Sequence, residues 1–182
     1  MRKLNIKEMN RISVEEFHSA EKFPLVIVLD NVRSLYNVGS IFRTCDAFRL
    51  EEIILCGITA YPPHPEIHKT ALGAEDSVKW SYLKNAEDAV VRLKSEGFEV
   101  LGVEQCEGST MLHNFSVDKD KKYAVVLGNE VKGVQQNVLD MCDGCLEIPQ
   151  YGTKHSMNVS VAAGIIIWSI VDQFLFDGQC VL

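Results

Sequence analysis

The sequence predicts an α/β domain with a mainly parallel sheet flanked by helices, and three observations support this. Short apolar segments of strand length alternate along the chain with segments of helical periodicity. Residues 25–29 are apolar at every position, as expected for a strand that is covered on both faces. The chain has 182 residues, of which 47% are hydrophobic, so one domain with a substantial core is expected.

The first half of the chain is expected to form a charged extension and the beginning of the sheet. Residues 1–22 are predicted to be a helical extension, separate from a domain at 23–182. The helix after the first strand has apolar residues at helical spacing, and Asn37 is placed to cap it. The elements expected here are a strand at 25–29, a helix at 38–48, a strand at 52–56, a proline-rich loop at 61–65, a short helix at 66–73 and a strand at 77–82.

The second half is expected to contain three helices and three further strands. One helix begins with Asn85 as its cap, buries an apolar face and ends at Gly97. The last helix starts with small residues and is apolar nearly all round, which indicates deep burial or a partner subunit. In order, the expected elements are a helix at 85–96, strands at 98–103 and 123–127, a helix at 134–141, a strand at 145–148 and a helix at 158–174.

The formal net charge of −7 is unusual for a nucleic-acid-binding protein, because phosphate binding needs lysines and arginines. Net charge does not determine local patches, however. A surface for a polyanion would draw on residues 1–22 and on Arg33, Arg43, Lys69, Lys132 and Lys154. No signal peptide is recognised at the N-terminus, and the most apolar stretch is too short to span a membrane, so a cytoplasmic protein is expected.

A metal site is not expected from the cysteines. Cys142 and Cys145 have the spacing of half a zinc site or of a redox pair. A structural zinc site normally needs a second pair or two closely spaced histidines, and the sequence has no second Cys pair. Packing between a helix and a strand is the simpler interpretation, with a metal or redox role as the alternative.

Three polar motifs, each at the end of an apolar segment, ask for a chemical explanation. The first runs from Asn37 to Arg43, the second from Leu127 to Gly133, and the third joins Ile148-Pro149 to a segment that begins at Ser156. A core does not require such polar residues at the ends of its strands. A phosphate-binding P-loop is excluded for the second motif, because valine and glutamine stand where that loop requires Lys and Ser or Thr.

Each motif also has a plain structural interpretation. Asn37 and Arg43 are either a helix cap and a solvated arginine, or a fork of donors for a phosphate or a ribose. Glu130 is either a solvated turn residue or a group that orients Arg43 or Asn158. Ser156 or Asn158 would serve as a helix cap, but capping alone does not explain the ordered triple.

The order and spacing of all three motifs resemble the SpoU (TrmH) branch of the SPOUT RNA methyltransferases, from about residue 24 to about residue 168. The resemblance implies a SPOUT α/β-knot fold, in which the loop of the third motif is threaded into a trefoil knot. It also implies S-adenosyl-L-methionine as the cofactor, bound in the knotted cleft, and a homodimer that completes the site across its interface.

The resemblance carries over to individual residues. It implies Arg43, Asn37, Glu130, Ser156 and Asn158 as the catalytic set. It implies cofactor contacts at Glu104, Leu127, Gly128, Ile148, Ser156 and Met157, although relatives often have a Thr-rich segment where this chain has Glu104. The family's arginine is proposed to help deprotonate the ribose 2′-hydroxyl. A guanidinium group holds its proton far above neutral pH, so anchoring a phosphate is the easier role to defend.

We therefore expect an RNA methyltransferase that acts on a ribose 2′-hydroxyl, with tRNA favoured over rRNA because the chain carries no added RNA-binding domain. One alternative is an RNA-binding dimer of the same fold with little catalysis. Another is a knotted methyltransferase that acts on rRNA, on a base or on a protein.

Overall fold

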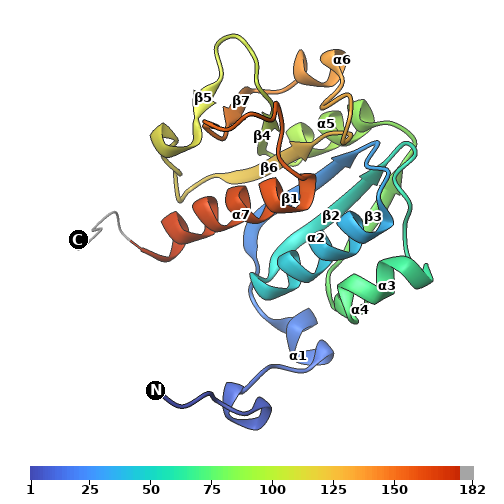
Figure 1. The fold of residues 1–182 in the computed structure, drawn as a ribbon, viewed down its shortest axis with the longest axis vertical. Helices are drawn as coiled ribbons and strands as arrows, with labels where there is room; N and C mark the ends of the chain where they lie inside the picture. Colours follow the sequence, from blue (N-terminus) through green and yellow to red (C-terminus); the bar gives the residue numbers. More distant parts are fainter. Residues whose placement is uncertain (177–182) are drawn as a thin grey trace.

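The structure is a computed structural model that describes residues 1–176, and it contains a parallel sheet with helices on both faces (Figure 1). The seven strands found in these residues lie in the order β3-β2-β1-β6-β4-β7-β5, and every neighbouring pair is parallel. The strands are β1 Phe23–Asp30, β2 Leu50–Cys56, β3 Trp80–Leu83, β4 Phe98–Val103, β5 Thr110–Met111, β6 Lys122–Leu127 and β7 Gly144–Glu147.

The helices cover the sheet in two layers. The helices α2 and α7 lie on the near face in Figure 1 and α5 lies behind the sheet, in agreement with the two hydrophobic clusters of the core. The α-helices are α1 Val14–Ser19, α2 Leu35–Ala47, α3 Pro65–Ala71, α4 Ala74–Ser77, α5 Ala86–Ser95, α6 Gln136–Leu139 and α7 Val159–Leu175, and the short 3-10 helices are η1 Ile6–Met9 and η2 Leu112–Asn114.

Strand β1 shows why its sequence is apolar throughout. Ile27 belongs to the cluster under α2 and α7, whereas Val26 and Val28 belong to the cluster under α5. Alternate side chains of one strand thus enter opposite layers, and both layers are apolar. The prediction of an α/β fold with a parallel sheet covered on both faces is confirmed.

Several predicted boundaries are wrong. Helix α2 begins at Leu35 and is capped by Ser34, whose Oγ accepts a hydrogen bond from the Asn37 backbone N–H at 3.3 Å, so Asn37 is not the cap. Helix α4 was not predicted. It includes residue 77, the first residue of the expected strand at 77–82, and β3 starts only at Trp80. Asn85 stands at the N-cap of α5 but makes no capping hydrogen bond with its side chain.

The second half shows smaller differences. Helix α6 is shorter than predicted, because a turn closed by mutual hydrogen bonds between Asn129 and Gly133 holds the chain up to residue 133. The two-residue strand β5 was missed, since a strand that short leaves no periodicity to read. Strand β4 and the apolar face of α5 are as expected.

The N-terminal segment is helical in two short pieces. Helices η1 and α1 each begin with a capping box, formed by Asn5 with Glu8 and by Ser13 with Glu16. Phe17 is buried against the cluster under α2 and α7. The division into an extension at 1–22 and a domain at 23–182 stays a prediction, and residues 177–182 of that predicted domain lie outside the described part. Over residues 1–176, no helix is long and apolar enough to cross a membrane.

Candidate active site

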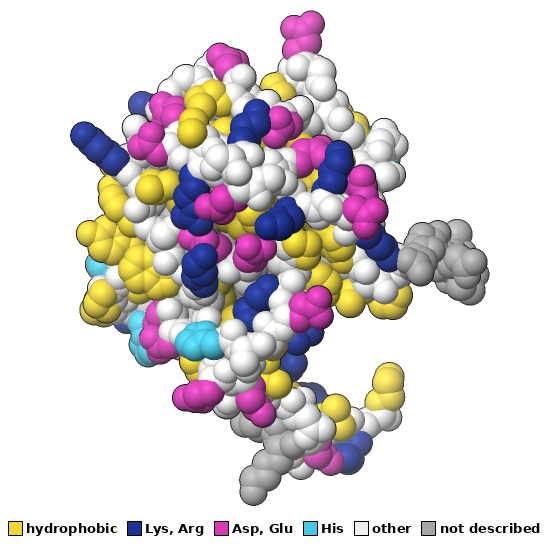
Figure 2. Space-filling view, turned by 180° about the vertical axis from the view of Figure 1, so that it is seen from behind, with side chains coloured by type: hydrophobic (Ala, Val, Ile, Leu, Met, Phe, Trp, Pro, Cys, Tyr) yellow, Lys and Arg dark blue, Asp and Glu magenta, His cyan; other side chains and the backbone are white. Residues whose placement is uncertain are grey.

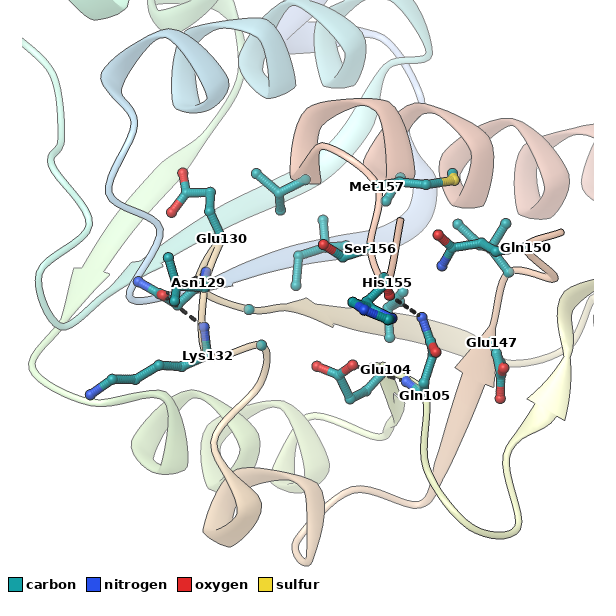
Figure 3. Close-up of a pocket in the computed structure, with 18 residues that line it drawn as sticks. Glu104, Gln105, Asn129, Glu130, Lys132, Glu147, Gln150, His155, Ser156 and Met157 are labelled. Atoms are coloured by element: carbon teal, nitrogen blue, oxygen red, sulfur yellow. Dashed lines mark hydrogen bonds between the residues drawn. The ribbon is translucent and has the colours of Figure 1, made fainter. Parts of the chain in front are cut away.

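A cleft with a volume of about 320 Å³ lies at the carboxyl ends of three neighbouring strands (Figure 3). Its walls are formed by the residues that end β4 (103–105), β6 (127–133) and β7 (147–150), and by the segment 155–162 that leads into α7. In parallel sheets, ligands bind in crevices at the carboxyl ends of the strands. The polar motifs found in the sequence therefore meet where such a sheet places its ligand.

The turn at the end of β6 requires glycine at both of its ends. A Cβ atom on Gly128 would lie 2.1 Å from the carbonyl carbon of Gly133 and from the nitrogen of Val134. Gly133 has a φ of +68°, in the left-handed region that favours glycine. Inside the turn, the Asn129 Oδ1 atom accepts hydrogen bonds from the backbone N–H groups of Val131 and Lys132, at 2.9 and 3.0 Å. Close approach of the backbone at Gly128 and a positive φ at Gly133 thus fix the shape of this turn beside the cleft.

The glutamate of this turn is held by residues from the other side of the site. The Glu130 carboxylate accepts hydrogen bonds from the backbone N–H groups of Arg33 and Ser34, both at 2.9 Å, and from Asn37 Nδ2 at 3.0 Å. Partial burial raises the pKa of Glu130, but these hydrogen bonds act in the opposite direction and leave it below its ordinary value of 4.5. The carboxylate is therefore ionised at neutral pH.

Asn37 connects this carboxylate to the beginning of α7. While its Nδ2 group donates to Glu130, its Oδ1 atom accepts a hydrogen bond from Asn158 Nδ2 at 3.1 Å. The Asn158 Oδ1 atom in turn caps α7, since it accepts from the N–H of Ser160 at 2.9 Å. Three residues that are up to 121 positions apart in the chain thus form one polar network, the Glu130–Asn37–Asn158 network, beside the cleft.

The structure brings together most of the residues predicted from the sequence. All six residues expected to contact the cofactor line the cleft, and Glu130 lines it as well. They are Glu104, Leu127, Gly128, Ile148, Ser156 and Met157. Asn37 and Asn158 stand behind the cleft in the network. The expectation that Glu130 orients Asn158 is met through Asn37, whereas a direct contact between Glu130 and Arg43 is absent from residues 1–176.

Arg43 lies apart from the cleft. Its exposed side chain lines a shallow depression between α2 and α3, together with Lys69 and three hydroxyl side chains. Within the described part of the chain its guanidinium group has no hydrogen bond or ion pair. The Arg43 side chain therefore points away from the buried face of α2, as its position in the helical pattern predicts.

Two residues at the ends of strands make hydrogen bonds that the sequence did not predict. Gln105 Nε2 donates to the His155 carbonyl oxygen at 2.7 Å and so connects the end of β4 to the loop before α7, as Figure 3 shows. Asn129 Nδ2 donates to the carbonyl of Asn31 at 2.8 Å and connects the ends of β6 and β1. Each residue lies two positions after the end of a buried strand, and Asn129 also belongs to the second polar motif.

The cysteine pair lies at the beginning of β7. Cys142 and Cys145 are free, and their thiols donate to the carbonyl oxygens of Val138 and Glu104. Burial raises the pKa of Cys142 to about 11. Over residues 1–176, no group of three or more His, Cys, Asp and Glu side chains is arranged to hold a metal ion.

The model of the SpoU rRNA Methylase family matches residues 24–168. The chain belongs to this family. One relative of this SpoU protein is a tRNA (guanosine(18)-2′-O)-methyltransferase of Thermus thermophilus, 33% identical over 174 residues, which are 94% of this chain and 86% of that enzyme. Another is a 23S rRNA (guanosine-2′-O-)-methyltransferase of Neisseria meningitidis, 29% identical over 159 residues, which are 87% of this chain and 62% of that enzyme.

A solved structure shows the same fold with a ligand. It is an AdoMet-bound rRNA methyltransferase from Sinorhizobium meliloti, with a TM-score of 0.76 and 27% sequence identity, and the match covers 91% of this chain and 62% of that one. The SpoU protein described here spans 59–67% of the length of several other curated relatives. Family and fold are thus shown for most of the chain.

Proposed function

We propose that this chain is an S-adenosylmethionine-dependent RNA methyltransferase that acts on a ribose 2′-hydroxyl, with tRNA favoured over rRNA. The observation that carries the proposal is the meeting of all six predicted cofactor residues in one cleft, beside the Glu130–Asn37–Asn158 network, in a chain of the SpoU family. The tRNA preference rests on the Thermus thermophilus relative, which this chain covers more fully than the rRNA enzyme of Neisseria meningitidis.

The residues of the cleft fit S-adenosylmethionine. Val103, Leu127 and Ile148 give it apolar walls, and its volume suits a small-molecule ligand. Three glutamates line it against one lysine, so the cleft favours a cation such as a sulfonium. When bound, the cofactor supplies a methyl carbon activated by that sulfonium.

The polar network positions the acceptor. Methyl transfer is an in-line displacement, so its rate depends on how well the ribose hydroxyl is aligned with the methyl carbon. Glu130 fixes the amide of Asn37, and Asn37 fixes that of Asn158, so these two amides are oriented before RNA binds. We assign Asn37 and Asn158 to holding the ribose, Glu130 to holding Asn37, and Ser156 to the contact between cofactor and acceptor.

Arg43 fits this mechanism best in a homodimer. Its guanidinium group is exposed, lies outside the cleft and has no partner within residues 1–176. In the proposed dimer it reaches the cleft of the second subunit and anchors a phosphate next to the reacting ribose. A guanidinium group serves this purpose well, since it keeps its charge and can donate two parallel hydrogen bonds.

An exposed apolar stripe on α7 supplies the dimer interface. Val161, Ile165 and Trp168 are 53%, 37% and 49% exposed and recur at helical spacing on one face. Trp168 contacts Phe48 at the end of α2, with 5.7 Å between the ring centroids, so the stripe continues toward the helix that carries Arg43. A second copy of the chain would cover these side chains and bring Arg43 toward its cleft.

We also propose that the segment from Ile148 to Asn158 is threaded to form the trefoil knot of the family. The hydrogen bond from Gln105 to His155 supports this, because it holds the segment against the end of β4. A cytoplasmic location follows from the proposed substrates, since both tRNA and rRNA occur there.

Transfer of labelled methyl groups to total tRNA and, separately, to rRNA tests the proposal, with modified nucleosides identified by mass spectrometry. Arg43→Ala should abolish formation of the 2′-O-methyl nucleoside and leave the thermal unfolding temperature unchanged. Arg49→Ala is the matched control, because Arg49 is exposed but does not line the depression that contains Arg43. Cofactor binding without transfer to either RNA would overturn the proposal in favour of an RNA-binding dimer, and a methylated base or protein would assign another acceptor.

A further inference from the structure

Three aromatic side chains form an exposed cluster at the β3 edge of the sheet, away from the cleft. The rings of Tyr61 and Tyr82 have centroids 4.9 Å apart, and Tyr61 is nearly parallel to Trp80, at 6.1 Å and 25°. Tyr61 is 50% exposed and Tyr82 is 41% exposed. Figure 2 shows hydrophobic side chains gathered on the side of the molecule where β3 lies. We call Tyr61, Trp80 and Tyr82 the aromatic cluster.

The fold holds this cluster rigidly without covering it. Trp80 and Tyr82 are two residues apart on β3 and so share one face of the strand, and Trp80 packs against the core. The Tyr82 hydroxyl donates to the carbonyl oxygen of Gly57 at 2.9 Å, and Tyr61 comes from the loop that follows β2. The Tyr61 hydroxyl has no hydrogen bond within residues 1–176. Tyr61 therefore presents a ring, supported from below, to the solvent.

Tyr61 and the cleft both lie toward the carboxyl ends of the strands, although the cluster is beside β3 and the cleft is at β6, β4 and β7. The loop of Tyr61 follows β2, and the end of β6 lines the cleft. Three strand spacings separate β3 from β6, which amounts to about 14 Å at about 4.8 Å per spacing. A polynucleotide bound in the cleft can span this distance with a few nucleotides.

Unpaired cations mark the path between the cluster and the cleft. Lys84 directly follows β3, Arg33 follows β1, and Lys132 lies in the turn after β6. All three are exposed, and in the described part of the chain none of their charged groups has a hydrogen bond or ion pair. In a chain with a net charge of −7, these cations at one edge favour a polyanion there.

An unpaired RNA base is the ligand that fits both features. Proteins recognise single-stranded RNA by stacking its bases on aromatic side chains beside a cationic path for the backbone. We propose that the aromatic cluster is a stacking platform for an unpaired base of the RNA substrate, a few nucleotides from the methylated ribose. This inference rests on the proposed RNA methyltransferase function. It adds a substrate contact that lies outside the cleft.

Substitutions at Tyr61 separate stacking from simple apolar contact. The dissociation constants of labelled total tRNA and rRNA are measured by filter binding, which does not require methyl transfer. Tyr61→Ala should weaken binding of the methylated RNA class about 5- to 100-fold. Tyr61→Phe should bind as the wild type does, and Tyr61→Leu should resemble Tyr61→Ala because it has no ring. Val91→Ala, an exposed apolar residue on α5, is the matched control and should have no effect.

The outcomes distinguish this inference from the proposed function. Unchanged RNA binding by Tyr61→Ala would overturn the platform even if methyl transfer is normal. Full RNA binding by Tyr61→Leu would also overturn it, because apolar contact without an aromatic ring would then be sufficient. Weakened RNA binding in a chain that transfers no methyl group would retain the platform and refute the enzyme. Ultraviolet cross-linking of the wild type to RNA gives an independent measurement that needs no variant, and the peptide containing Tyr61 should carry the cross-link.

Discussion

Replacing Glu130 by glutamine tests whether the Glu130–Asn37–Asn158 network holds the site together. Glutamine has the same size as glutamate but carries a donor in place of one of the two acceptor oxygens. One carboxylate oxygen accepts from Ser34 N–H and Asn37 Nδ2, and the other accepts from Arg33 N–H alone. If the amide oxygen of the glutamine keeps the bonds from Ser34 and Asn37, the NH₂ group of the glutamine faces the N–H of Arg33. Two donors then oppose each other.

The expected change in the free energy of unfolding follows from the number of hydrogen bonds affected. A hydrogen bond to a charged group contributes about 1.5–3 kcal/mol. Glu130 is only partly buried, so water can replace part of the lost bond, and we expect the lower end of this range. Glu130→Gln should therefore lower the free energy of unfolding by about 1.5 kcal/mol, or about 3–6 °C in melting temperature for a chain of this size. Methyl transfer should fall as well, because the two opposed donors push the substituted side chain away from Arg33 and shift the oxygen that holds Asn37.

The effect on stability should depend on pH with a definite sign. The pKa of Glu130 in the folded protein lies below its ordinary value of 4.5, so the folded state favours the ionised form. The stabilisation is complete at neutral pH and is lost as the pH falls through the folded-state pKa. Urea unfolding of wild type and Glu130→Gln should differ most near pH 7, and the difference should shrink below about pH 4.5.

Two results would refute this reasoning. The first is a Glu130→Gln protein that keeps both wild-type stability and wild-type methyl transfer, since the network would then hold nothing in place. The second is a difference in stability that does not change between pH 7 and pH 3. Glu107→Gln is the matched control, because Glu107 is exposed and its side chain has no partner in residues 1–176; it should alter neither quantity.

Two further substitutions and one chemical modification test other parts of the structure. Gly128→Ala should weaken cofactor binding at least tenfold in a calorimetric titration, because the added methyl group would lie 2.1 Å from backbone atoms. Gly152→Ala should bind the cofactor normally, because a methyl group there has no atom within 4 Å. Glu52→Gln should lower the free energy of unfolding in urea by about 2 kcal/mol, since buried Glu52 accepts hydrogen bonds from Arg92 at 2.6 Å and from Lys79 at 2.9 Å, yet leave methyl transfer unchanged. Alkylation of Cys142, followed by mass spectrometry, should be slow at pH 7.5 and speed up toward pH 11, its pKa being about 11.

The fold was predictable because its strands are apolar on both faces. Strands β4 and β6 were placed to within one residue, and the strand predicted at 25–29 is the apolar centre of β1 Phe23–Asp30, since a buried parallel strand needs an unbroken apolar run. Strand β3 was placed three residues too early. Its edge position leaves Tyr82 exposed, so the apolar signal is interrupted there, and the neighbouring residues form α4 instead. Strand order is a long-range property that no local pattern specifies.

The residues that line the cleft were implied by the resemblance to the SpoU family, whereas the hydrogen bonds that connect them were not. Gly128 and Ile148 directly follow strands of the parallel sheet, which explains why the structure brings them to one cleft. The partner of Glu130 was not predictable in this way. Asn37 is 93 residues away, and its side chain meets Glu130 only because β1 and β6 are neighbours in the sheet.

The misplaced helix cap explains how Asn37 becomes part of the site. A capping asparagine uses its side-chain oxygen on the N–H groups of the first turn. Ser34 performs this task for α2, by accepting from the N–H of Asn37. The side chain of Asn37 is therefore not used for capping. Its Nδ2 group donates a hydrogen bond to Glu130, and its Oδ1 atom accepts one from Asn158. An alanine at position 37 would leave the cap of α2 intact while it disconnects Glu130 from Asn158, so Asn37→Ala should keep the helix and lose the orientation of the site.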